Sequence, residues 1–269
     1  MKRRRVALRA VGGALFVYVT VSLVIVALQR KLLFPAPAPA PVDAGAGSLV
    51  EGRSPHGRRV VALWSEAAPD APALVYFHGN GMQLADCGAL APVLRREGWS
   101  LFAVEYPGYG PLHADAVSED AIVDVAVGAM ALLRDALGVP RERTVLVGQS
   151  LGSGVATALA ARGEGSRLVL LTPFTSVPDM AAAILPWPGV RWLVRDRFDN
   201  AAKAPSITTP TLVVHGTRDE VVPYAQGQAL AGRFAHGHLV TIHGAHHNDL
   251  WDAYRPELLA ALRGFVTPR

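Results

Sequence analysis

Short, almost uniformly apolar runs recur along the chain from residue 73 onward, and segments with apolar residues at helical spacing lie between them. Because a strand that is buried on both faces reads as a continuous apolar run, this alternation predicts an α/β protein whose mostly parallel sheet has helices on both faces. We expect strands at 73–78, 99–104, 144–147, 167–171, 211–215 and 239–243, and helices at 82–97, 118–137, 150–162, 223–234 and 249–265.

Two regions depart from this alternation. Residues 48–51 and 59–64 flank turn-forming residues at 55–57 and predict an antiparallel hairpin. Residues 172–210 form the one long interval without a clear strand, and they include apolar and aromatic residues such as Trp187 and Trp192. This interval is interpreted either as a small lid over an apolar acyl pocket or as ordinary packing at the edge of the sheet.

The N-terminus carries a long uncharged apolar segment. Ala10–Leu28 contains no charge, and a helix of this length, rising about 1.5 Å per residue, nearly matches the thickness of a bilayer's hydrocarbon core. A cleaved signal peptide is the alternative, but its apolar region is about 7–15 residues long and small residues follow it, whereas Arg30 and Lys31 follow here. We therefore expect an uncleaved membrane anchor.

The basic residues that flank this segment predict its orientation. Lys2–Arg5 and Arg9 precede the segment, and only Arg30 and Lys31 follow it closely. The positive-inside rule then places the N-terminus in the cytoplasm and the rest of the chain on the outer, extracytoplasmic or periplasmic side of a single-pass protein.

The chain is thus divided into a basic cluster and transmembrane anchor (1–31), a Pro/Ala-rich linker (32–47) and a globular domain (48–269) whose lid region spans about 172–210. In the linker, proline alternates with alanine from Pro35 to Pro41. Such a sequence favours polyproline II, so we expect a semi-rigid spacer that holds the body off the membrane.

Composition excludes several classes of protein. The chain is 51% hydrophobic and 18% charged, which excludes a disordered protein, and its single cysteine, Cys87, excludes a disulfide framework or a cysteine-rich zinc site. Seven of the 26 basic residues lie within 1–31, which contains no acid, so the remainder carries 19 basic against 22 acidic residues. The net positive charge belongs to the anchor, and no nucleic-acid partner is expected.

One motif has the context of a catalytic nucleophile. Gly148-Gln149-Ser150-Leu151-Gly152 follows a predicted strand and opens a predicted helix, as a Gly-x-Ser-x-Gly nucleophile elbow does. The tight turn excludes bulky side chains at positions 148 and 152. Ser150 is then presented at a helix N-terminus, where the helix dipole favours developing negative charge.

A nucleophilic serine needs a base and an acid that orients the base. The acid follows the strand 211–215, where Asp219 and Glu220 are both candidates and a simple helix-capping acid is the alternative. The base follows the last strand, where His246 and His247 are both candidates. A metal site built on His243, His246 and His247 is a further reading, but no carboxylate lies at helical spacing from them, and no metal or cofactor is expected.

An oxyanion hole requires backbone N–H groups that are preorganised at the carbonyl oxygen of the substrate. The residue after the nucleophile, Leu151, is one expected donor. Asn80, in the glycine-rich loop 78–81 after the strand 73–78, is the second. We expect His78 to hold this loop in place and not to take part in catalysis.

These motifs together resemble the α/β-hydrolase superfamily, and within it the membrane-tethered serine hydrolases whose eukaryotic members include depalmitoylases and lysophospholipid lipases. The resemblance covers about residues 28–268. It implies an α/β-hydrolase fold with a small lid, and alignment on His-Asn implies that His247 is the base, with His246 in a position that usually holds glycine. The motifs that carry it are Phe77-His78-Gly79-Asn80-Gly81, Tyr106-Pro107-Gly108-Tyr109-Gly110, Gly148–Gly154, His215–Pro223 and His247-Asn248-Asp249-Leu250.

The leading interpretation is therefore a serine hydrolase that cleaves carboxylic esters or thioesters of small-molecule or lipid-like acyl substrates through an acyl-enzyme. Ser150 attacks, His247 transfers the proton, Asp219 orients His247, and Asn80 and Leu151 stabilise the oxyanion. The alternatives are a peptidase or amidase of the same fold and a non-catalytic binding protein on a hydrolase scaffold.

Overall fold

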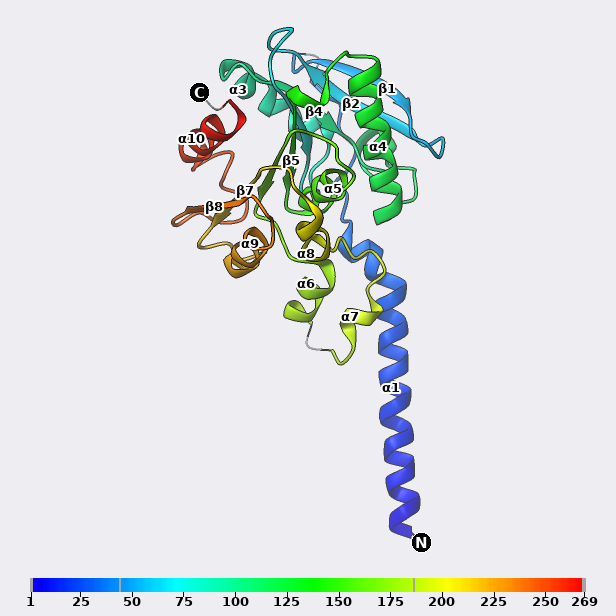
Figure 1. Ribbon diagram of the computed structural model, residues 1–269. Coiled ribbons are helices and arrows are strands. Elements are labelled where there is room, and N and C mark those ends of the chain that lie inside the picture. The colour runs from blue at the N-terminus through cyan, green and yellow to red at the C-terminus, as the bar shows by residue number, and fades with distance from the viewer. Residues whose placement is uncertain (1, 44, 186, 268–269) are drawn as a thin grey trace.

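The computed structural model describes residues 2–43, 45–185 and 187–267 and consists of an α/β body with a long N-terminal helix (Figure 1). The helix α1 (Lys2–Leu33) projects from the body, and its segment from Val11 to Leu33 is long and apolar enough to cross a membrane. In Figure 1 the N-terminus and the C-terminus lie at opposite ends of the molecule.

The centre of the body is one eight-stranded sheet with the order β1-β2-β4-β3-β5-β6-β7-β8. The hairpin strands β1 and β2 are antiparallel, β2 also pairs antiparallel with β4, and every other neighbouring pair is parallel. The predicted hairpin and the predicted mostly parallel sheet are both confirmed. The strands are β1 (Ser48–Arg53), β2 (Arg59–Ser65), β3 (Ala73–Phe77), β4 (Ser100–Val104), β5 (Thr144–Gln149), β6 (Arg167–Leu171), β7 (Thr211–Gly216) and β8 (Gly237–Ile242).

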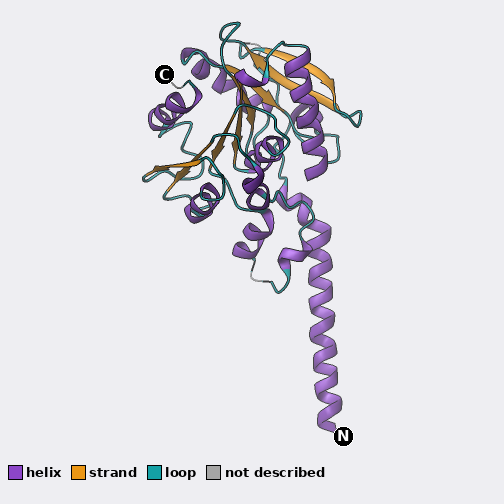
Figure 2. Ribbon diagram, in the orientation of Figure 1, coloured by secondary structure: helices purple, strands orange, loops and turns teal. Residues whose placement is uncertain are grey.

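Helices cover both faces of this sheet (Figure 2). Alternate residues of β3 show the division, because Val75 and Phe77 enter one buried cluster while Leu74 and Tyr76 enter the other. The first cluster lies under α4 (Glu119–Asp135), α5 (Leu151–Ala160) and α9 (Tyr224–Ala231), and the second lies under α2 (Leu84–Cys87), α3 (Ala91–Arg96) and α10 (Arg255–Val266). The remaining helices are α6 (Val177–Ile184), α7 (Val190–Leu193) and α8 (Asn200–Lys203).

Two predicted helices begin or break where proline requires it. The helix expected at 82–97 consists of α2, a 3₁₀ turn and α3, and the helix expected at 249–265 begins only at Arg255 after a series of turns. Pro92 and Pro256 each stand in the first turn of the helix that follows. Proline lacks the N–H that an interior position donates but suits the first helical turn, so a new helix starts at each of these residues.

The proline-rich segment after α1 packs against the body and does not form a free spacer. Phe34 is buried in the core, and Gln83 bonds the segment twice, donating to the carbonyl oxygen of Ala38 and accepting from the N–H of Ala40. These contacts lay the extended chain along the body. The end of α1 therefore abuts the folded domain directly.

Candidate active site

The loop between β5 and α5 holds Ser150 in a strained backbone conformation. Its φ of 50° and ψ of −114° lie in a region that residues with a side chain rarely occupy, and its N–H donates to the carbonyl oxygen of Leu171 at 2.9 Å. A Cβ atom at Gly148 would lie 2.3 Å from the carbonyl oxygen of Gly152, and one at Gly152 would lie 1.9 Å from that of Phe77. Glycine at both positions is therefore a steric requirement of the turn.

Ser150, His247 and Asp219 form one hydrogen-bonded chain. Nδ1 of His247 lies 2.8 and 3.0 Å from the two carboxylate oxygens of Asp219, and Nε2 lies 3.0 Å from Oγ of Ser150. A carboxylate only accepts, so Nδ1 carries the proton, and Nε2 has its lone pair toward the serine hydroxyl. This arrangement can remove the proton from Ser150 as the serine attacks an electrophile.

Asp219 is buried and held by several donors. Its Oδ1 accepts from the N–H groups of Val221 and Val222, and its Oδ2 lies 3.1 Å from Nε2 of His215. Burial by itself would raise the pKa of Asp219, but the hydrogen bonds from His215 and His247 and the charge of His247 hold this pKa well below its usual value. Asp219 is thus ionised wherever the protein is folded at ordinary pH.

His215 contacts Asp219, and the sequence analysis assigned it no role. Its Nε2 faces two acceptors, the Asp219 carboxylate and the carbonyl oxygen of Val222 at 2.9 Å, so Nε2 is the protonated nitrogen. The ring is fully buried. The signal in the sequence is a histidine near the end of β7, four residues before Asp219.

The two rival residues form a separate exposed pair. Nδ1 of His246 lies 2.9 Å from Oε2 of Glu220, and both side chains are about half exposed. Among the described residues, neither His246 nor Glu220 makes a side-chain hydrogen bond to Ser150, His247 or Asp219. The geometry therefore separates the two candidate bases that adjacent sequence positions left open.

The glycine-rich loop after β3 lies against the nucleophile. A Cβ atom at Gly79 would come 3.5 Å from Cβ of Ser150. The side chain of Asn80 is engaged elsewhere, because its Nδ2 donates to the carbonyl oxygen of Leu33 and its Oδ1 accepts from the Tyr109 hydroxyl at 2.8 Å. Within the described residues neither Asn80 nor Leu151 donates its backbone N–H to another protein group, so both N–H groups remain available to a ligand.

His78 supports this loop from below, as expected. Its ring is buried, with Nδ1 3.0 Å from the carbonyl oxygen of Gly79 and Nε2 3.0 Å from Oε1 of Glu105. Glu105 also accepts from the N–H groups of Leu84 and Tyr106. This buried pair braces the loop that carries Asn80.

A cavity of about 360 Å³ adjoins these residues. Three of its lining residues are chain neighbours of the site, since Gln149 precedes Ser150, Asn248 follows His247 and Met82 follows the glycine-rich loop. The rest of the wall is mainly apolar and consists of Tyr76, Ala89, Leu90, Val93 and Trp251. Two charged residues, Asp86 and Arg255, complete it. A larger hollow of about 610 Å³ lies between the hairpin turn and α4 and touches none of the three hydrogen-bonded residues.

The described residues contain no cluster of three or more histidine, cysteine or acidic side chains arranged to hold a metal ion. His243 does not take part in the hydrogen bonds that join Asp219, His247 and Ser150.

Comparison with known proteins identifies related sequences. The profile of the alpha/beta hydrolase fold matches residues 72–202, and that of TAP-like proteins matches residues 189–257. The chain is 31% identical over 219 residues to alpha/beta hydrolase domain-containing protein 17B of Xenopus tropicalis and 30% identical over 219 residues to that of Homo sapiens, in each case over 80% of this chain and 73% of the relative. An uncharacterized protein of Mycobacterium tuberculosis is 32% identical over 73% of this chain and 70% of its own length.

Solved structures share the fold at lower identity. The esterase Pf2001 of Pyrococcus furiosus matches with a TM-score of 0.68 at 17% identity, covering 87% of this chain and 99% of the esterase. The esterase of Exiguobacterium antarcticum matches with a TM-score of 0.62 at 17% identity, covering 82% of this chain and 99% of its own.

Proposed function

Because this chain belongs to the α/β-hydrolase superfamily, as a relative of alpha/beta hydrolase domain-containing protein 17B, we propose that it is a serine hydrolase that cleaves carboxylic esters or thioesters of apolar acyl groups. Its fold and its relatives support an enzyme of the α/β-hydrolase type. The proposed serine mechanism is carried by the series of hydrogen bonds from Asp219 through His247 to Ser150, with contacts of 2.8 and 3.0 Å.

In the proposed reaction Oγ of Ser150 attacks the acyl carbon while Nε2 of His247 takes the hydroxyl proton. The Asp219 carboxylate stabilises the imidazolium that forms. The oxyanion of the tetrahedral intermediate accepts hydrogen bonds from the backbone N–H groups of Asn80 and Leu151. Its collapse expels the alcohol or thiol, which takes the proton from His247. Water then attacks the acyl carbon while His247 takes a proton from it, and the second tetrahedral intermediate breaks its bond to Oγ of Ser150, which takes that proton back as the acid leaves.

The cavity beside the site supports an apolar acyl group as the substrate portion. Its lining by Tyr76, Leu90, Val93 and Trp251 suits a hydrocarbon chain, and Gln149, which precedes Ser150 in the chain, also lines it. A peptide substrate would need a site for its charged terminus, and the two charged residues of this cavity, Asp86 and Arg255, are of opposite sign and form no cluster of like charge.

The membrane is part of the proposal. We assign α1 as a single-pass anchor with the basic N-terminus in the cytoplasm and the catalytic body on the outer side, because its apolar stretch matches a bilayer and its preceding charges are positive.

Labelling with a fluorophosphonate and hydrolysis of p-nitrophenyl esters of increasing chain length test the catalytic assignment. Ser150→Ala should abolish labelling and lower kcat/KM by about a thousandfold or more, since it removes the attacking oxygen. Ser206→Ala, at an exposed serine, is the matched control and should retain full activity and labelling. A Ser150→Ala enzyme that keeps most of its activity would exclude the serine-hydrolase mechanism.

A further inference from the structure

The lid region packs along the anchor helix. The ring of Trp187 stacks on that of Tyr18 with 5.5 Å between centroids, its Nε1 donates to Oγ of Ser22, and the Tyr18 hydroxyl donates to the carbonyl oxygen of Pro188. Higher up, the side-chain amide of Gln29 donates to the carbonyl oxygen of Leu193. Trp187, Pro188 and α7 therefore lie beside α1 between Tyr18 and Gln29.

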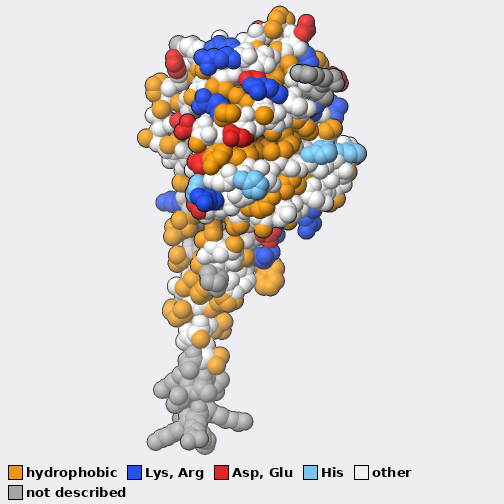
Figure 3. Space-filling model, turned by 90° about the vertical axis from the view of Figure 1, so that its left-hand side faces the viewer, with side chains coloured by type: hydrophobic (Ala, Val, Ile, Leu, Met, Phe, Trp, Pro, Cys, Tyr) orange, Lys and Arg blue, Asp and Glu red, His pale blue; other side chains and the backbone are white. Residues whose placement is uncertain are grey.

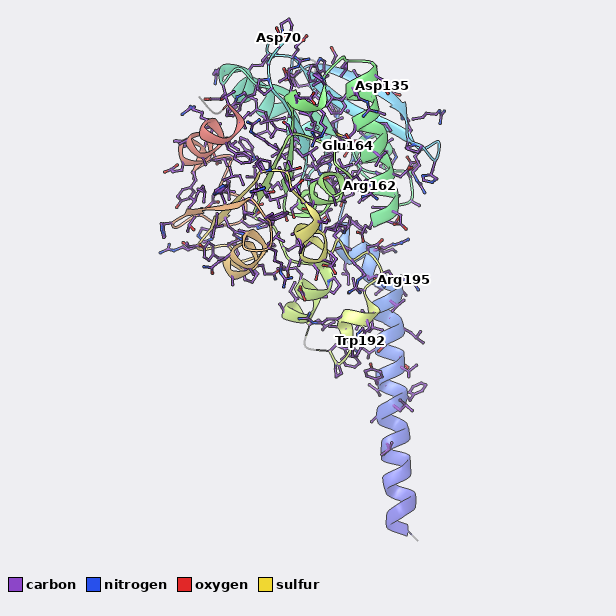
Figure 4. The ribbon with its side chains drawn as sticks, viewed as in Figure 1. Asp70, Asp135, Arg162, Glu164, Trp192 and Arg195 are labelled. Carbon is purple, nitrogen blue, oxygen red and sulfur yellow. The ribbon has the colours of Figure 1, made fainter. Side chains whose placement is uncertain are left out.

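The free end of this lid exposes large hydrophobic side chains. Ile184 is 74% exposed, Leu185 39% and Trp192 87%, and we call these three residues the apolar lid tip. Figure 4 shows Trp192 at the lower end of the body beside α1, whereas the labelled acids Asp70 and Asp135 lie at the opposite end. Figure 3 shows that mainly hydrophobic side chains continue from the lower body onto the described part of α1.

The length of α1 decides where this tip lies if the helix spans a bilayer. Tyr18 is about 14 Å along the helix from Arg9 and about 18 Å from Arg30, at a rise of about 1.5 Å per residue. A body held wholly outside the membrane would leave only residues 10–17 to cross it, or about 12 Å against a hydrocarbon core of about 30 Å. Spanning therefore requires the lid beside Tyr18 to lie at hydrocarbon depth.

The polar groups of the lid are arranged as such a position requires. The N–H groups of Leu185, Trp187 and Val190 all donate within the lid, and prolines at 186 and 188 have no N–H to satisfy. Arg191 is the charged residue next to Trp192, and its guanidinium reaches Asp179 in the first turn of α6, at the other end of that helix from Ile184. Its long side chain thus directs the charge away from the apolar lid tip.

Several basic residues lie near the junction of α1 and the body. Arg30 pairs with the buried carboxylate of Asp196 at 2.8 Å, and Lys31, Arg195 and Arg197 are exposed nearby in the chain. Figure 4 places Arg195 nearer to the body than Trp192. Apolar side chains at depth with arginine and lysine above them match hydrocarbon below anionic headgroups.

The glycine-rich loop that carries Asn80 also lies at the body end of α1. Asn80 donates to the carbonyl oxygen of Leu33, the last residue of α1, and the chain reaches α6 six residues after Leu171, which bonds the N–H of Ser150. The loop beside Ser150 thus lies at the end of α1 where the helix meets the body.

We propose that the apolar lid tip is inserted into the hydrocarbon of the outer leaflet beside α1, so that the enzyme takes its acyl substrate from that leaflet and not from water. The part that concerns substrate entry rests on the proposed hydrolase function. The part that concerns insertion does not.

The insertion is tested on the full-length protein in phosphatidylcholine vesicles, with an environment-sensitive nitrobenzoxadiazole label on a new cysteine. Trp192→Cys is compared with Leu49→Cys, a control on β1 at an exposed apolar residue, and the native Cys87 is buried and leaves the wild type unlabelled. Aqueous dithionite should reduce the label at 192 at least tenfold more slowly than that at 49, and nitroxide on lipid acyl chains should quench only the label at 192. Equal reduction rates would overturn the insertion.

Substrate entry is tested with Trp192→Asp and Ile184→Asp against Leu49→Asp. The two lid variants should lose at least tenfold in kcat/KM toward a long-chain thioester carried in the vesicles, keep activity toward a water-soluble acetate ester, and differ in this from Leu49→Asp, which should keep both. Full activity of the lid variants on the vesicle substrate would overturn entry from the leaflet. If the wild type hydrolyses neither substrate while the label at 192 is protected, the hydrolase function fails and the insertion stands.

Discussion

Two neighbouring histidines have different surroundings in this protein. His247 is 6% exposed and lies between Asp219 and Ser150, whereas the His246 side chain is 49% exposed and pairs with Glu220. Successive residues of a loop point in different directions, so only one of two adjacent side chains reaches a given atom. The same separation applies to the acids, since Asp219 is buried and Glu220 is exposed.

We expect His247→Ala to remove nearly all ester hydrolysis and His246→Ala to keep at least a tenth of it. Among the described residues, only His247 Nε2 is within hydrogen-bond distance of the Ser150 hydroxyl. His246→Ala should keep the pH profile of the wild type, because it leaves the contacts among Asp219, His247 and Ser150 in place. A dead His246→Ala beside an active His247→Ala would reverse the assignment.

Asp219→Asn should lower kcat by about a thousandfold or more, because an amide does not hold the His247 ring in the required tautomer. Glu220→Gln is the matched control and should change kcat less than threefold. Because the pKa of Asp219 is held below its usual value, its ionised form stabilises the fold above the ordinary carboxyl range, and this is lost only as the pH falls through the lowered value. Asp219 therefore stays ionised between pH 7 and 5. Rate measurements and circular dichroism of both variants decide the matter.

At the scale of elements, β5 and α5 meet in a turn that admits no side chain at its ends. Gly152→Ala would place a Cβ atom 1.9 Å from the carbonyl oxygen of Phe77 on the adjacent strand β3, and backbone cannot move aside without disturbing the sheet. We expect a loss of at least about 3 kcal/mol in the free energy of unfolding, or a Tm lower by about 6–12 °C. Thermal denaturation measures this.

Gly264→Ala is the control for that variant. Gly264 lies in α10, and nothing stands within 4 Å of its missing Cβ. Alanine exceeds glycine in helix propensity by about 0.8–1 kcal/mol, so this variant should be as stable as the wild type or more stable. Equal effects of the two substitutions would contradict the steric account of the turn.

The whole molecule is a folded body that contacts one long apolar helix at two places, with Trp187 against Tyr18 and Ser22 and with the loop of Asn80 against Leu33. The proposed orientation of that helix follows from charge alone. It is tested in intact cells with a membrane-impermeant maleimide. Asp70→Cys, in an exposed loop at the end of the body away from α1 (Figure 4), should be labelled, whereas Lys2→Cys should be labelled only after lysis. Because Cys87 is fully buried, the wild type supplies the background. The reverse pattern would place the body in the cytoplasm.

Much of this architecture can be predicted from the chain itself. Parallel strands buried on both faces are apolar throughout, so runs such as those of β3 and β4 are recognisable, and the elbow needs glycine at 148 and 152 for steric reasons that act within a few residues. The apolar length of α1 and the charges before it are likewise properties of a continuous segment. Local sterics and burial over short stretches leave a readable pattern.

Contacts between distant segments leave no such pattern, and only the tertiary structure decided them. The choice of His247 over His246 depends on where a loop after β8 lies relative to a turn after β5. Three further contacts depend on the assembled sheet and lid. They are the contact of His215 with Asp219, the hydrogen bond from the Asn80 side chain to the end of α1, and the stacking of Trp187 on Tyr18. The proline-rich segment shows the same limit, because its sequence favours an extended spacer, but the buried Phe34 and the side chain of Gln83 hold it against the body. An extended chain exposes its hydrogen-bonding groups, and whether water or a distant side chain satisfies them is set by the fold as a whole.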